Sequence, residues 1–194
     1  MPLLVLASGS GARRELLNRL GLPYCHAAPD IDETPRRHET PAVLAERLSR
    51  EKALALAERY PDHLIIGSDQ VASIDNELLG KPGGIDAARQ QLQRFSGRRV
   101  SFLTGLALLD TRHNHCATHV DLTSVDIRTL SAQEIEGYLE KEPAIDSAGG
   151  FYMEQLGTAL FDSVETTDPS ALMGLPLITL CRLLRDAGVN PLLK

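Results

Sequence analysis

The order of hydrophobic and polar residues predicts a strand and then a helix at the start of the chain. Leu3–Ala7 is a short apolar run that passes directly into serines and glycines, which is typical of a buried strand before a turn. Leucines then recur on one side of a helix, with Ser10 at its N-cap and Gly21 at its end. The apolar run ends too early for a signal peptide, so we interpret it as the first strand of the fold.

The following blocks predict more helices, separated by polar segments. Pro29–Glu39 is polar and contains two prolines, so we expect a loop there. Thr40 and Pro41 are a typical N-cap and first helical residue, and no helix breaker follows through Arg59. Further helices are predicted over residues 85–95, 131–141 and 176–188, and the second of these opens with a capping box.

Apolar runs bounded by turn residues predict the remaining strands. Asp75 and Asn76 separate two short runs, an arrangement typical of a hairpin. The predicted strands are His63–Ser68, Val71–Ile74, Glu77–Leu79, Val100–Leu109, Ala117–Arg128 and Ala159–Phe161. Helices mixed with hairpins predict an α/β fold with a mixed sheet, and the absence of repeats and linkers predicts one domain over residues 1–194.

Charge and composition narrow the classes of function. The chain has 194 residues and a formal net charge of -6, which disfavours a general nucleic-acid binder because such proteins need a basic surface. A few cations focused in one cleft can still bind a small polyanion. No apolar run approaches the length of a membrane span, and three widely spaced cysteines disfavour a disulfide framework. We therefore expect a cytoplasmic protein that acts on a small molecule and contacts no membrane.

The turn after the first strand has the composition of an oxyanion site. Ser8 and Ser10 supply hydroxyls, Arg13 supplies a guanidinium, and the start of the following helix supplies free backbone N–H groups. Arg14 stands where a dinucleotide-binding fingerprint needs its third glycine, and a P-loop would need a lysine that this turn lacks. These residues alone leave both a phosphate site and an ordinary tight turn open.

Other segments hold candidate residues, each with a simpler structural explanation. Asp30–Glu33 could bind a hard metal ion, although a solvated acidic loop is the commoner case. Lys52 lies in the long helix, where lysine is usually at the surface. Asp69 and Gln70 follow a buried strand, at the kind of strand end where ligands bind in α/β proteins, although Asp69 could simply cap a turn. Lys81 lies between a glycine and a proline, and only four of the 20 basic residues are lysines.

Three histidines form a separate candidate metal site. His113, His115 and His119 would share one face of a regular strand, with Cys116 nearby. However, the first two fall at the expected hairpin turn, where strand alternation breaks down. Exposed polar residues at a hairpin tip are therefore the commoner interpretation.

Seven short motifs occur in order along the chain. They are Ser8-x-Ser10-x-x-Arg13, Asp32-Glu33, Glu51-Lys52-Ala53, Gly67-Ser68-Asp69, Gly80-Lys81-Pro82, Ser147-Ala148-Gly149 and Gly174-Leu175-Pro176-Leu177. In this order they resemble the motifs of the Maf family of nucleoside triphosphate pyrophosphatases. Each motif is weak alone, but the ordered set is specific and the resemblance extends from Leu3 to Pro191.

The resemblance implies a fold, a reaction and a cofactor. The implied fold is a single elongated α/β domain of two lobes around a mixed sheet, with a central cleft, as in inosine-triphosphatase-like enzymes. The implied reaction cleaves a nucleoside triphosphate between its α- and β-phosphates, depends on a divalent cation such as Mg²⁺ or Mn²⁺, and releases a nucleoside monophosphate and pyrophosphate. The resemblance is also compatible with a homodimer.

Individual roles follow from the same resemblance. It implies that Asp69 accepts a proton, and we predict that Lys52, Lys81 and Glu33 also take part in catalysis. A metal needs carboxylates, and Glu33 and Asp69 are the available candidates; Asp69 could hold the metal, orient a water molecule, or do both. The residues implied to line the phosphate end are Ser8, Arg13, Glu33, Lys52 and Lys81. Physically, the cations can neutralise the pyrophosphate that leaves, and the carboxylates suit a divalent metal.

Within the family, the chain is most similar to the branch that hydrolyses 7-methyl-GTP. The segment 32–36, Gln70 directly after Asp69, and Glu154 are the marks of this branch, and Ala12, Gln70 and Glu154 occupy positions linked to base choice. A carboxylate at Glu154 can accept hydrogen bonds from the N1–H and the exocyclic amine of guanine, and it favours the positive charge of an N7-methylated ring.

A methylated guanine is often held by aromatic stacking. The chain has no Trp, and Ala12 stands where this branch can have one. Phe151 and Tyr152 are the aromatic residues that could replace it.

Two other functions remain open at this point. The first is a pyrophosphatase for dTTP and UTP, as in the other branch of the family. The second is a nucleotide-binding regulator of septum formation, although the presence of Asp69 and Lys81 favours an enzyme.

Overall fold

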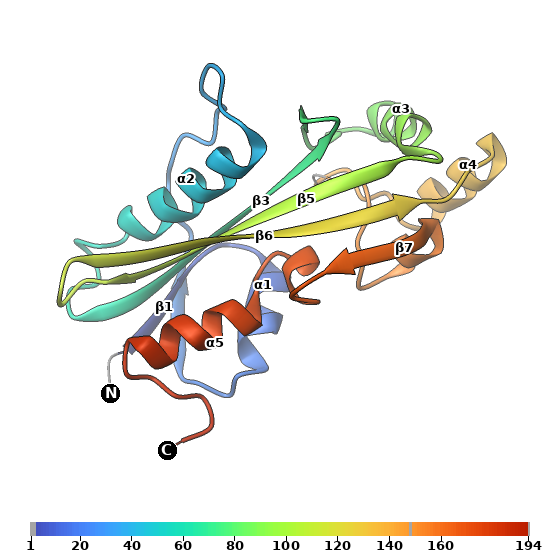
Figure 1. Ribbon diagram of the computed structural model, residues 1–194. Coiled ribbons are helices and arrows are strands. Elements are labelled where there is room, and N and C mark those ends of the chain that lie inside the picture. Colours follow the sequence, from blue (N-terminus) through green and yellow to red (C-terminus); the bar gives the residue numbers. More distant parts are fainter. Residues whose placement is uncertain (1–2, 148, 194) are drawn as a thin grey trace.

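The computed structural model of the chain describes residues 3–147 and 149–193. Within these residues, five α-helices pack on one seven-stranded mixed sheet (Figure 1). The strands are β1 (Leu3–Ala7), β2 (Tyr24–Ala27), β3 (His63–Ile74), β4 (Glu77–Leu79), β5 (Arg99–Asp110), β6 (His115–Ile127) and β7 (Phe161–Thr166). The helices are α1 (Gly11–Asn18), α2 (Pro41–Leu54), α3 (Ile85–Phe95), α4 (Ala132–Lys141) and α5 (Leu177–Asp186). The predicted α/β class with a mixed sheet is confirmed.

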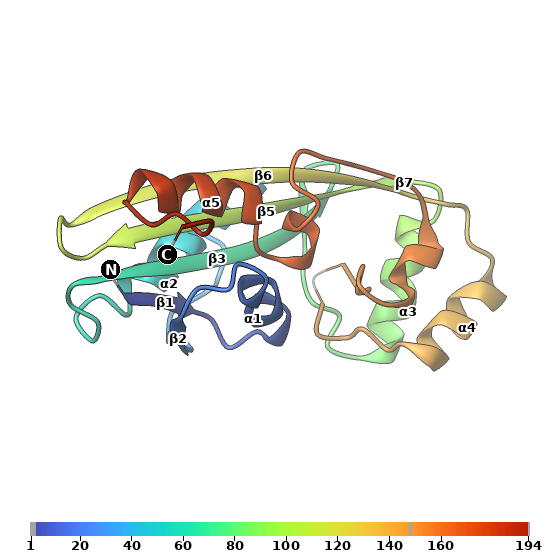
Figure 2. The ribbon, with the colours of Figure 1, turned by 90° about the horizontal axis from the view of Figure 1, so that it is seen from below.

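Three long strands give the molecule its elongated shape and its two lobes. The strand order is β2-β1-β3-β5-β6-β7, with β4 beside β3, and the β1–β2 and β1–β3 pairs are parallel. Strands β3, β5 and β6 run through the whole length of the molecule (Figures 1 and 2). Lobe one holds β1, β2, α1, α2 and α5, and lobe two holds β4, β7, α3 and α4.

Each lobe has its own apolar core. In lobe one, α1 and α5 cover one face of the sheet, where Leu16, Leu17 and Leu184 are fully buried. Helix α2 covers the opposite face and buries Ala53 there. In lobe two, α3 and α4 pack over the far ends of the long strands, around Phe95 and other residues. The two cores share the long strands and the segment 172–173, and a cleft lies beside this connection.

A gap in strand pairing marks where the lobes part. Strand β1 pairs with β3 from His63 to Gly67, and β4 pairs with β3 from Ala72 to Ile74. Between them, 68–71 has no strand partner on that edge among the described residues. Asp69 and Gln70 therefore lie on the unpaired edge that faces the space between the lobes.

Two glycines let α2 lie directly on the sheet. A Cβ atom on Gly67 would come within 2.0 Å of the Ser49 carbonyl oxygen, and one on Gly105 within 2.1 Å of the Ala45 carbonyl oxygen. Only glycine permits such an approach between a helix backbone and a strand. This contact fixes the height of α2 above the part of β3 that holds Asp69.

The prediction that a strand ends at Ser68 is wrong. Strand β3 continues for 12 residues, and β5 pairs with it from Leu64 to Ser73 without a break. Gly67 is there for the contact with α2 and does not end the strand. Asp69 is thus in the middle of β3, and the strand end beside it is that of β1.

Two further predictions from the sequence are confirmed and two are corrected. The hairpin at Asp75 and Asn76 is confirmed, with φ angles of 50° and 65° at these two residues, and so is the capping box of α4. The predicted helix 42–59 ends at Leu54, because the chain tightens into turns that bury Leu56. Residues 159–161 are not a strand by themselves: a 3₁₀ helix over Leu156–Leu160 leads into β7.

Three further features concern the polar loop, the cysteines and the helices. The segment 29–39 has no helix or strand, as predicted. Cys25, Cys116 and Cys181 are free thiols. No helix in the described part of the chain is both long and apolar enough to cross a bilayer.

Candidate active site

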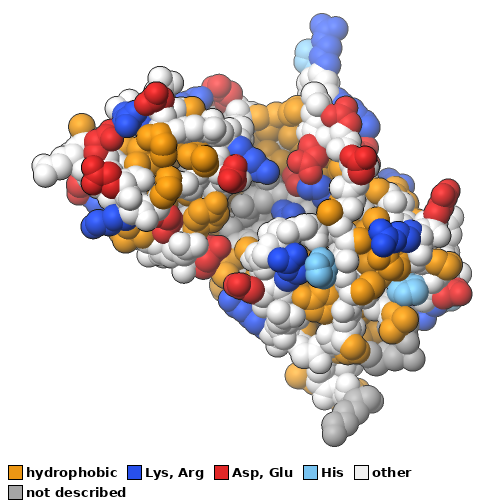
Figure 3. Space-filling view, turned by 180° about the vertical axis from the view of Figure 1, so that it is seen from behind, with side chains coloured by type: hydrophobic (Ala, Val, Ile, Leu, Met, Phe, Trp, Pro, Cys, Tyr) orange, Lys and Arg blue, Asp and Glu red, His pale blue; other side chains and the backbone are white. Residues whose placement is uncertain are grey.

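A cleft of about 750 Å³ lies between the two lobes. Figure 3 shows the hollow from behind, with charged side chains around its rim. It is lined by the β1–α1 turn, Glu33, Lys52 of α2, the unpaired part of β3, Lys81, the segment around 146–155 and the segment 172–174. Segments from the whole chain therefore meet in one place.

The β1–α1 turn presents donors to the cleft. The Ser10 side chain caps α1 by accepting a hydrogen bond from the Arg13 backbone N–H. The Ser8 hydroxyl accepts hydrogen bonds from the Ser10 N–H at 3.1 Å and from Arg13 at 3.5 Å. A helix N-terminus with two hydroxyls and a guanidinium suits an oxyanion.

Arg13 is held in position by the other end of the chain. Its Nε donates to the Gly174 carbonyl at 2.8 Å, and the Ser68 hydroxyl donates to the same oxygen at 2.8 Å. Gly174 has a φ of 99°, a left-handed conformation that favours glycine. Burial lowers the pKa of Arg13, and the charges of Asp69 and Glu33 act against that shift.

Lys52 joins two carboxylates at the centre of the cleft. Its Nζ lies 2.6 Å from Asp69 Oδ1 and 2.7 Å from Glu33 Oε1. Lys52 is 7% exposed and Asp69 is 8% exposed, so most of this ion pair is shielded from water. Burial acts to raise the pKa of Glu33, but the hydrogen bond from Lys52 and the charges of Lys52, Lys81 and Arg13 outweigh it and lower the pKa.

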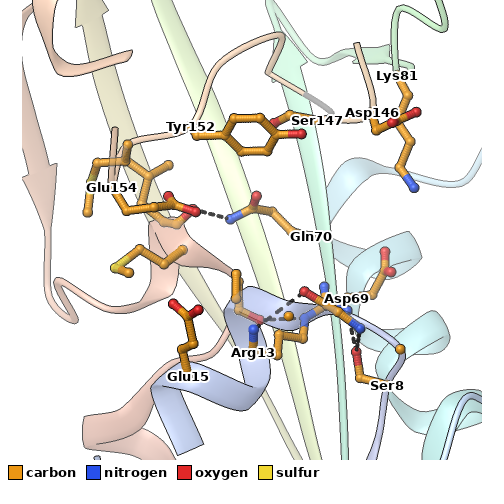
Figure 4. A pocket seen from close by; sticks show the side chains of 18 of the residues that line it. Ser8, Arg13, Glu15, Asp69, Gln70, Lys81, Asp146, Ser147, Tyr152 and Glu154 are labelled. Atoms are coloured by element: carbon orange, nitrogen blue, oxygen red, sulfur yellow. Dashed lines mark hydrogen bonds between the residues drawn. The ribbon is translucent and has the colours of Figure 1, made fainter. Parts of the chain in front are cut away.

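Lys81 approaches from the side of lobe two. It is exposed, lines the cleft and is near enough to Glu33 to contribute to the lowered pKa of that carboxyl. It forms no ion pair with the described residues. Three cations, Arg13, Lys52 and Lys81, thus line the same cleft from three different segments. Figure 4 shows Arg13 and Lys81 with Asp69 between them.

The two carboxylates of the site fit a divalent cation whose remaining ligands come from the substrate. Asp69 and Glu33 converge on a single positive charge, the Lys52 ammonium. Mg²⁺ typically binds through one or two carboxylates together with substrate phosphate oxygens. In the described residues, no group of three or more His, Cys, Asp or Glu side chains is arranged to hold a metal by itself.

Gln70 has a fixed orientation at the other end of the cleft. Its Nε2 donates to the backbone carbonyls of Ala171 and Leu172, each at 3.0 Å, and to Thr104 Oγ1 at 3.2 Å. Its amide donors are therefore occupied, and Oε1 is left to accept a hydrogen bond. Ala12 and the exposed side chain of Glu154 line the same end.

The sequence as a whole matches known proteins. A family model described as "Maf-like protein" matches residues 3–187. The chain belongs to the Maf family. It is 57% identical over 193 residues to a protein of Chromohalobacter salexigens named 7-methyl-GTP pyrophosphatase, which covers 99% of this chain and 100% of that relative. A Xanthomonas campestris pv. campestris protein with the same name is 52% identical over 190 residues, 98% of each chain.

All of the site residues proposed from the Maf resemblance line this one cleft. They are Ser8, Ala12, Arg13, Glu33, Lys52, Asp69, Gln70, Lys81 and Glu154. Of the motif residues, Ala148 lies outside the described part of the chain. The placement of these residues supports the Maf assignment of the site, while their individual roles stay predictions.

Other candidates from the sequence lie outside the Maf cleft. Asp32 accepts a hydrogen bond from the Thr34 N–H, so it stabilises a turn, and only Glu33 of the acidic segment lines the cleft. Arg14 turns towards His26, at 3.4 Å. Of the Asp32-Glu33 motif, only Glu33 therefore lines the cleft, and of the two arginines in the turn only Arg13 does.

The histidine site predicted as an alternative is not formed. His113 Nδ1 lies 2.9 Å from Asp110, and His119 Nε2 lies 3.6 Å from Asp121, so the two histidines have separate partners. His115 begins β6 after the hairpin tip. Within the described residues, no cluster of these side chains could hold a metal.

Residue-level reasoning missed several side chains that line the cleft. Glu15 lies in the first part of α1, after the β1–α1 turn, and Asp146 directly precedes the motif that begins at Ser147. Gly174 was noted only as part of a motif, yet its carbonyl holds Arg13. The helical spacing of Ala12 and Glu15, three residues apart, is the one signal in the sequence that could have identified Glu15.

Proposed function

We propose that this chain hydrolyses 7-methyl-GTP to 7-methyl-GMP and pyrophosphate. The observation that carries this proposal is the arrangement of Arg13, Lys52 and Lys81 around Asp69 and Glu33 in one cleft. Three cations match the charge of a triphosphate, and a carboxylate among them can activate water. The names of two relatives that are more than half identical to this chain support the choice of nucleotide.

The phosphate end binds and polarises the triphosphate. Arg13, Lys81 and the free N–H groups at the start of α1 receive phosphate oxygens, and the Ser8 hydroxyl is within reach of the same turn. As the bond between the α-phosphorus and its bridging oxygen breaks, negative charge grows on the departing pyrophosphate. Fixed cations stabilise that charge without reorganisation.

Asp69 is the proposed proton acceptor. A water molecule attacks the α-phosphorus, its proton passes to the Asp69 carboxylate, and the bridging oxygen leaves with the pyrophosphate. Lys52 keeps Asp69 oriented through the 2.6 Å contact and keeps its second carboxylate partner, Glu33, beside it. Glu33 and Asp69 are also the residues that would hold Mg²⁺ or Mn²⁺. When bound, such a cation would neutralise part of the negative charge of the triphosphate.

The base end supplies hydrogen-bond acceptors. Gln70 Oε1 and the Glu154 carboxylate can accept from the N1–H and the exocyclic amine of guanine. The Ala12 side chain leaves room at the same end. The reaction would remove a modified nucleotide from the nucleotide pool, and we place it in the cytoplasm. We assign it to a single domain over residues 1–194, which is compatible with a homodimer.

A substrate panel tests the proposal. Pyrophosphate release would be measured from 7-methyl-GTP, GTP, dTTP and UTP with Mg²⁺ or Mn²⁺, with Asp69→Asn as the inactive control. We expect the highest kcat/KM for 7-methyl-GTP. A preference for dTTP or UTP would favour the other branch of the family, and no release from any triphosphate would contradict the enzyme assignment.

A further inference from the structure

The cleft holds three aromatic side chains, and two of them are committed to the core of lobe two. Phe102 and Phe151 are 2% and 4% exposed. Their rings meet edge to face with centroids 5.4 Å apart, and the Phe151 ring meets Phe161 at 4.8 Å. Because both side chains are almost fully buried in the core, neither ring can receive a planar ligand.

Tyr152 is the third aromatic residue, and its ring is free. It is half-buried on the lobe-two wall, and within the described residues its ring has no aromatic partner and its hydroxyl has no hydrogen bond. Figure 4 shows the ring beside Gln70. Burial raises the pKa of Tyr152, and the charges of Asp146, Glu154 and Glu142 add to the shift.

The backbone of Tyr152 is nevertheless firmly held. Glu142, which is 8% exposed, accepts a hydrogen bond from the Tyr152 N–H at 3.3 Å and another from the Leu156 N–H at 2.7 Å. The Tyr152 carbonyl accepts from the N–H groups of Gln155 and Gly157, each at 3.2 Å. A ring on a fixed backbone, with no intramolecular partner, is pre-organised to meet a ligand.

Two carboxylates flank the same end of the cleft from opposite walls. Glu154 comes from the loop that holds Tyr152, and Glu15 comes from α1. In Figure 4 both lie on one side of Gln70 and Arg13, whereas Ser8, Asp69 and Lys81 lie on the other. Both side chains are exposed and form no ion pair with the described residues. The end that holds Glu15 and Glu154 thus has two carboxylates without an ion pair to the described residues, whereas Asp69 and Glu33 at the other end are paired with Lys52.

We propose that Tyr152 and Glu15 are specificity-determining residues that, with Glu154, select a purine base because it carries a positive charge. The inference rests on the proposed function and identifies what separates 7-methyl-GTP from GTP. The two nucleotides have the same phosphates and the same Watson–Crick edge, but methylation at N7 makes the ring a delocalised cation. The Tyr152 face attracts that cation through its quadrupole, and the two carboxylates attract it through their charge.

The test compares the selectivity ratio, kcat/KM for 7-methyl-GTP divided by kcat/KM for GTP. We expect Tyr152→Leu to lower this ratio about tenfold, mainly through KM for the methylated nucleotide. Tyr152→Phe should keep it, because the ring face remains. Glu15→Gln should lower the ratio several-fold, and more at low salt than at high salt. Glu140→Gln, a change of an exposed carboxylate on α4, is the matched control and should leave it unchanged.

Two outcomes would overturn the inference. A ratio that Tyr152→Leu leaves unchanged contradicts it, and so does an equal loss for both nucleotides, which would indicate general packing. Calorimetric binding of 7-methyl-GMP and GMP gives a second measurement that needs no turnover. If the wild type releases no pyrophosphate from any triphosphate, the proposed function fails, while preference for 7-methyl-GMP that depends on Tyr152 would still uphold the inference.

Discussion

At the scale of single residues, Lys52 holds together two carboxylates that would otherwise repel each other. Its ammonium contacts Asp69, which is buried as Lys52 is, and Glu33, whose side chain is 51% exposed. Removal of one partner from a buried ionic group costs more than the net contribution of the group, because the remaining charges lose their compensation. Lys52 therefore affects both the stability and the chemistry of the cleft.

Replacement of Lys52 should separate these effects. We expect Lys52→Met to lower kcat about 100-fold or more, because a cation near the leaving pyrophosphate is lost. We also expect a loss of about 1–3 kcal/mol in the free energy of unfolding. Steady-state kinetics and urea unfolding measure the two. Lys141→Met, which alters an exposed lysine on α4, should change neither kcat nor the free energy of unfolding. A fully active Lys52→Met variant would contradict a catalytic role for Lys52.

Individual site residues could be predicted from the sequence, but their contacts could not. Glycine and proline beside Lys81, and the apolar run before Asp69, are local signals that short motifs preserve. The contact between Lys52 and Asp69 joins residues 17 positions apart on a helix and a strand. Such a contact depends on how α2 crosses the sheet, which no local pattern specifies.

At the scale of elements, the glycine contact under α2 sets the distance between helix and strand. A methyl group at Gly67 would meet the Ser49 carbonyl at 2.0 Å and the Ala53 nitrogen at 2.9 Å, both in the helix backbone. The helix would have to move away from β3. Lys52 moves with α2, whereas Asp69 stays on β3.

Gly67→Ala should therefore reduce stability and activity together. We expect a loss of about 1–3 kcal/mol in the free energy of unfolding, from overpacking, and a lower kcat. Gly137→Ala is the matched control, because a Cβ at Gly137 in α4 meets nothing within 4 Å. It should raise stability by about 0.5–1 kcal/mol and leave kcat unchanged. Urea unfolding and pyrophosphate release measure both variants, and equal effects would contradict the close-approach explanation.

The loop 29–39 is joined to α2 by an ion pair that depends on pH. Arg47 of α2 holds the loop that contains Glu33 by binding Glu39 at 2.6 Å and the Thr34 carbonyl at 3.1 Å. The hydrogen bond from Arg47 lowers the pKa of Glu39 from 4.5 to about 2. A carboxyl with a lowered folded-state pKa contributes stability above its unfolded pKa and loses it as the pH falls.

Acid should therefore weaken the connection between this loop and α2. We expect the free-energy difference between the wild type and Glu39→Gln to be largest above pH 4.5 and to shrink as the pH falls towards 2. Urea unfolding at a series of pH values between 5 and 2.5 measures this difference. Glu140→Gln should differ from the wild type by the same small amount throughout, and a constant difference for Glu39→Gln would contradict the pairing.

The sequence divided β3 into two strands because Gly67 resembles a strand end. Glycine weakens strand propensity, and the apolar run pauses there. Pairing with β5 along the entire strand overrides that local signal. The short strand β2 was missed for a related reason, since four residues beside a proline give too little pattern, and its pairing with β1 is what defines it.

At the scale of the whole molecule, the cleft exists because two cores share three strands and part at the unpaired edge of β3. This arrangement is non-local, so the two lobes and the cleft came from the family resemblance and not from the pattern of residues. The proposed phosphate end of the cleft is lined by segments of both lobes, and so is the proposed base end. A bound nucleotide would therefore bridge the lobes.

Ligand binding should stabilise both walls at once. A 7-methyl-GTP analogue with a methylene group between the α- and β-phosphorus atoms, at 100 times its Kd, should add about 2.7 kcal/mol to the free energy of unfolding. Hydrogen exchange should slow in residues 8–15 and in residues 149–157. Protection on the wall of lobe one alone would contradict binding between the lobes.

Glu142 accepts hydrogen bonds from both ends of the loop 152–156, whose middle lines the proposed base end of the cleft. This arrangement affects how the family can evolve. The loop can vary in composition while its backbone stays in place. The residues proposed as proton acceptor and phosphate-binding cations, Asp69, Arg13, Lys52 and Lys81, all belong to other segments. Substrate preference can therefore change while the reaction stays the same. We expect a lineage that alters Tyr152 or Glu154 to keep hydrolysis and to prefer a different nucleotide. Duplicated copies of such a gene can share one reaction and divide the cell's damaged nucleotides between them.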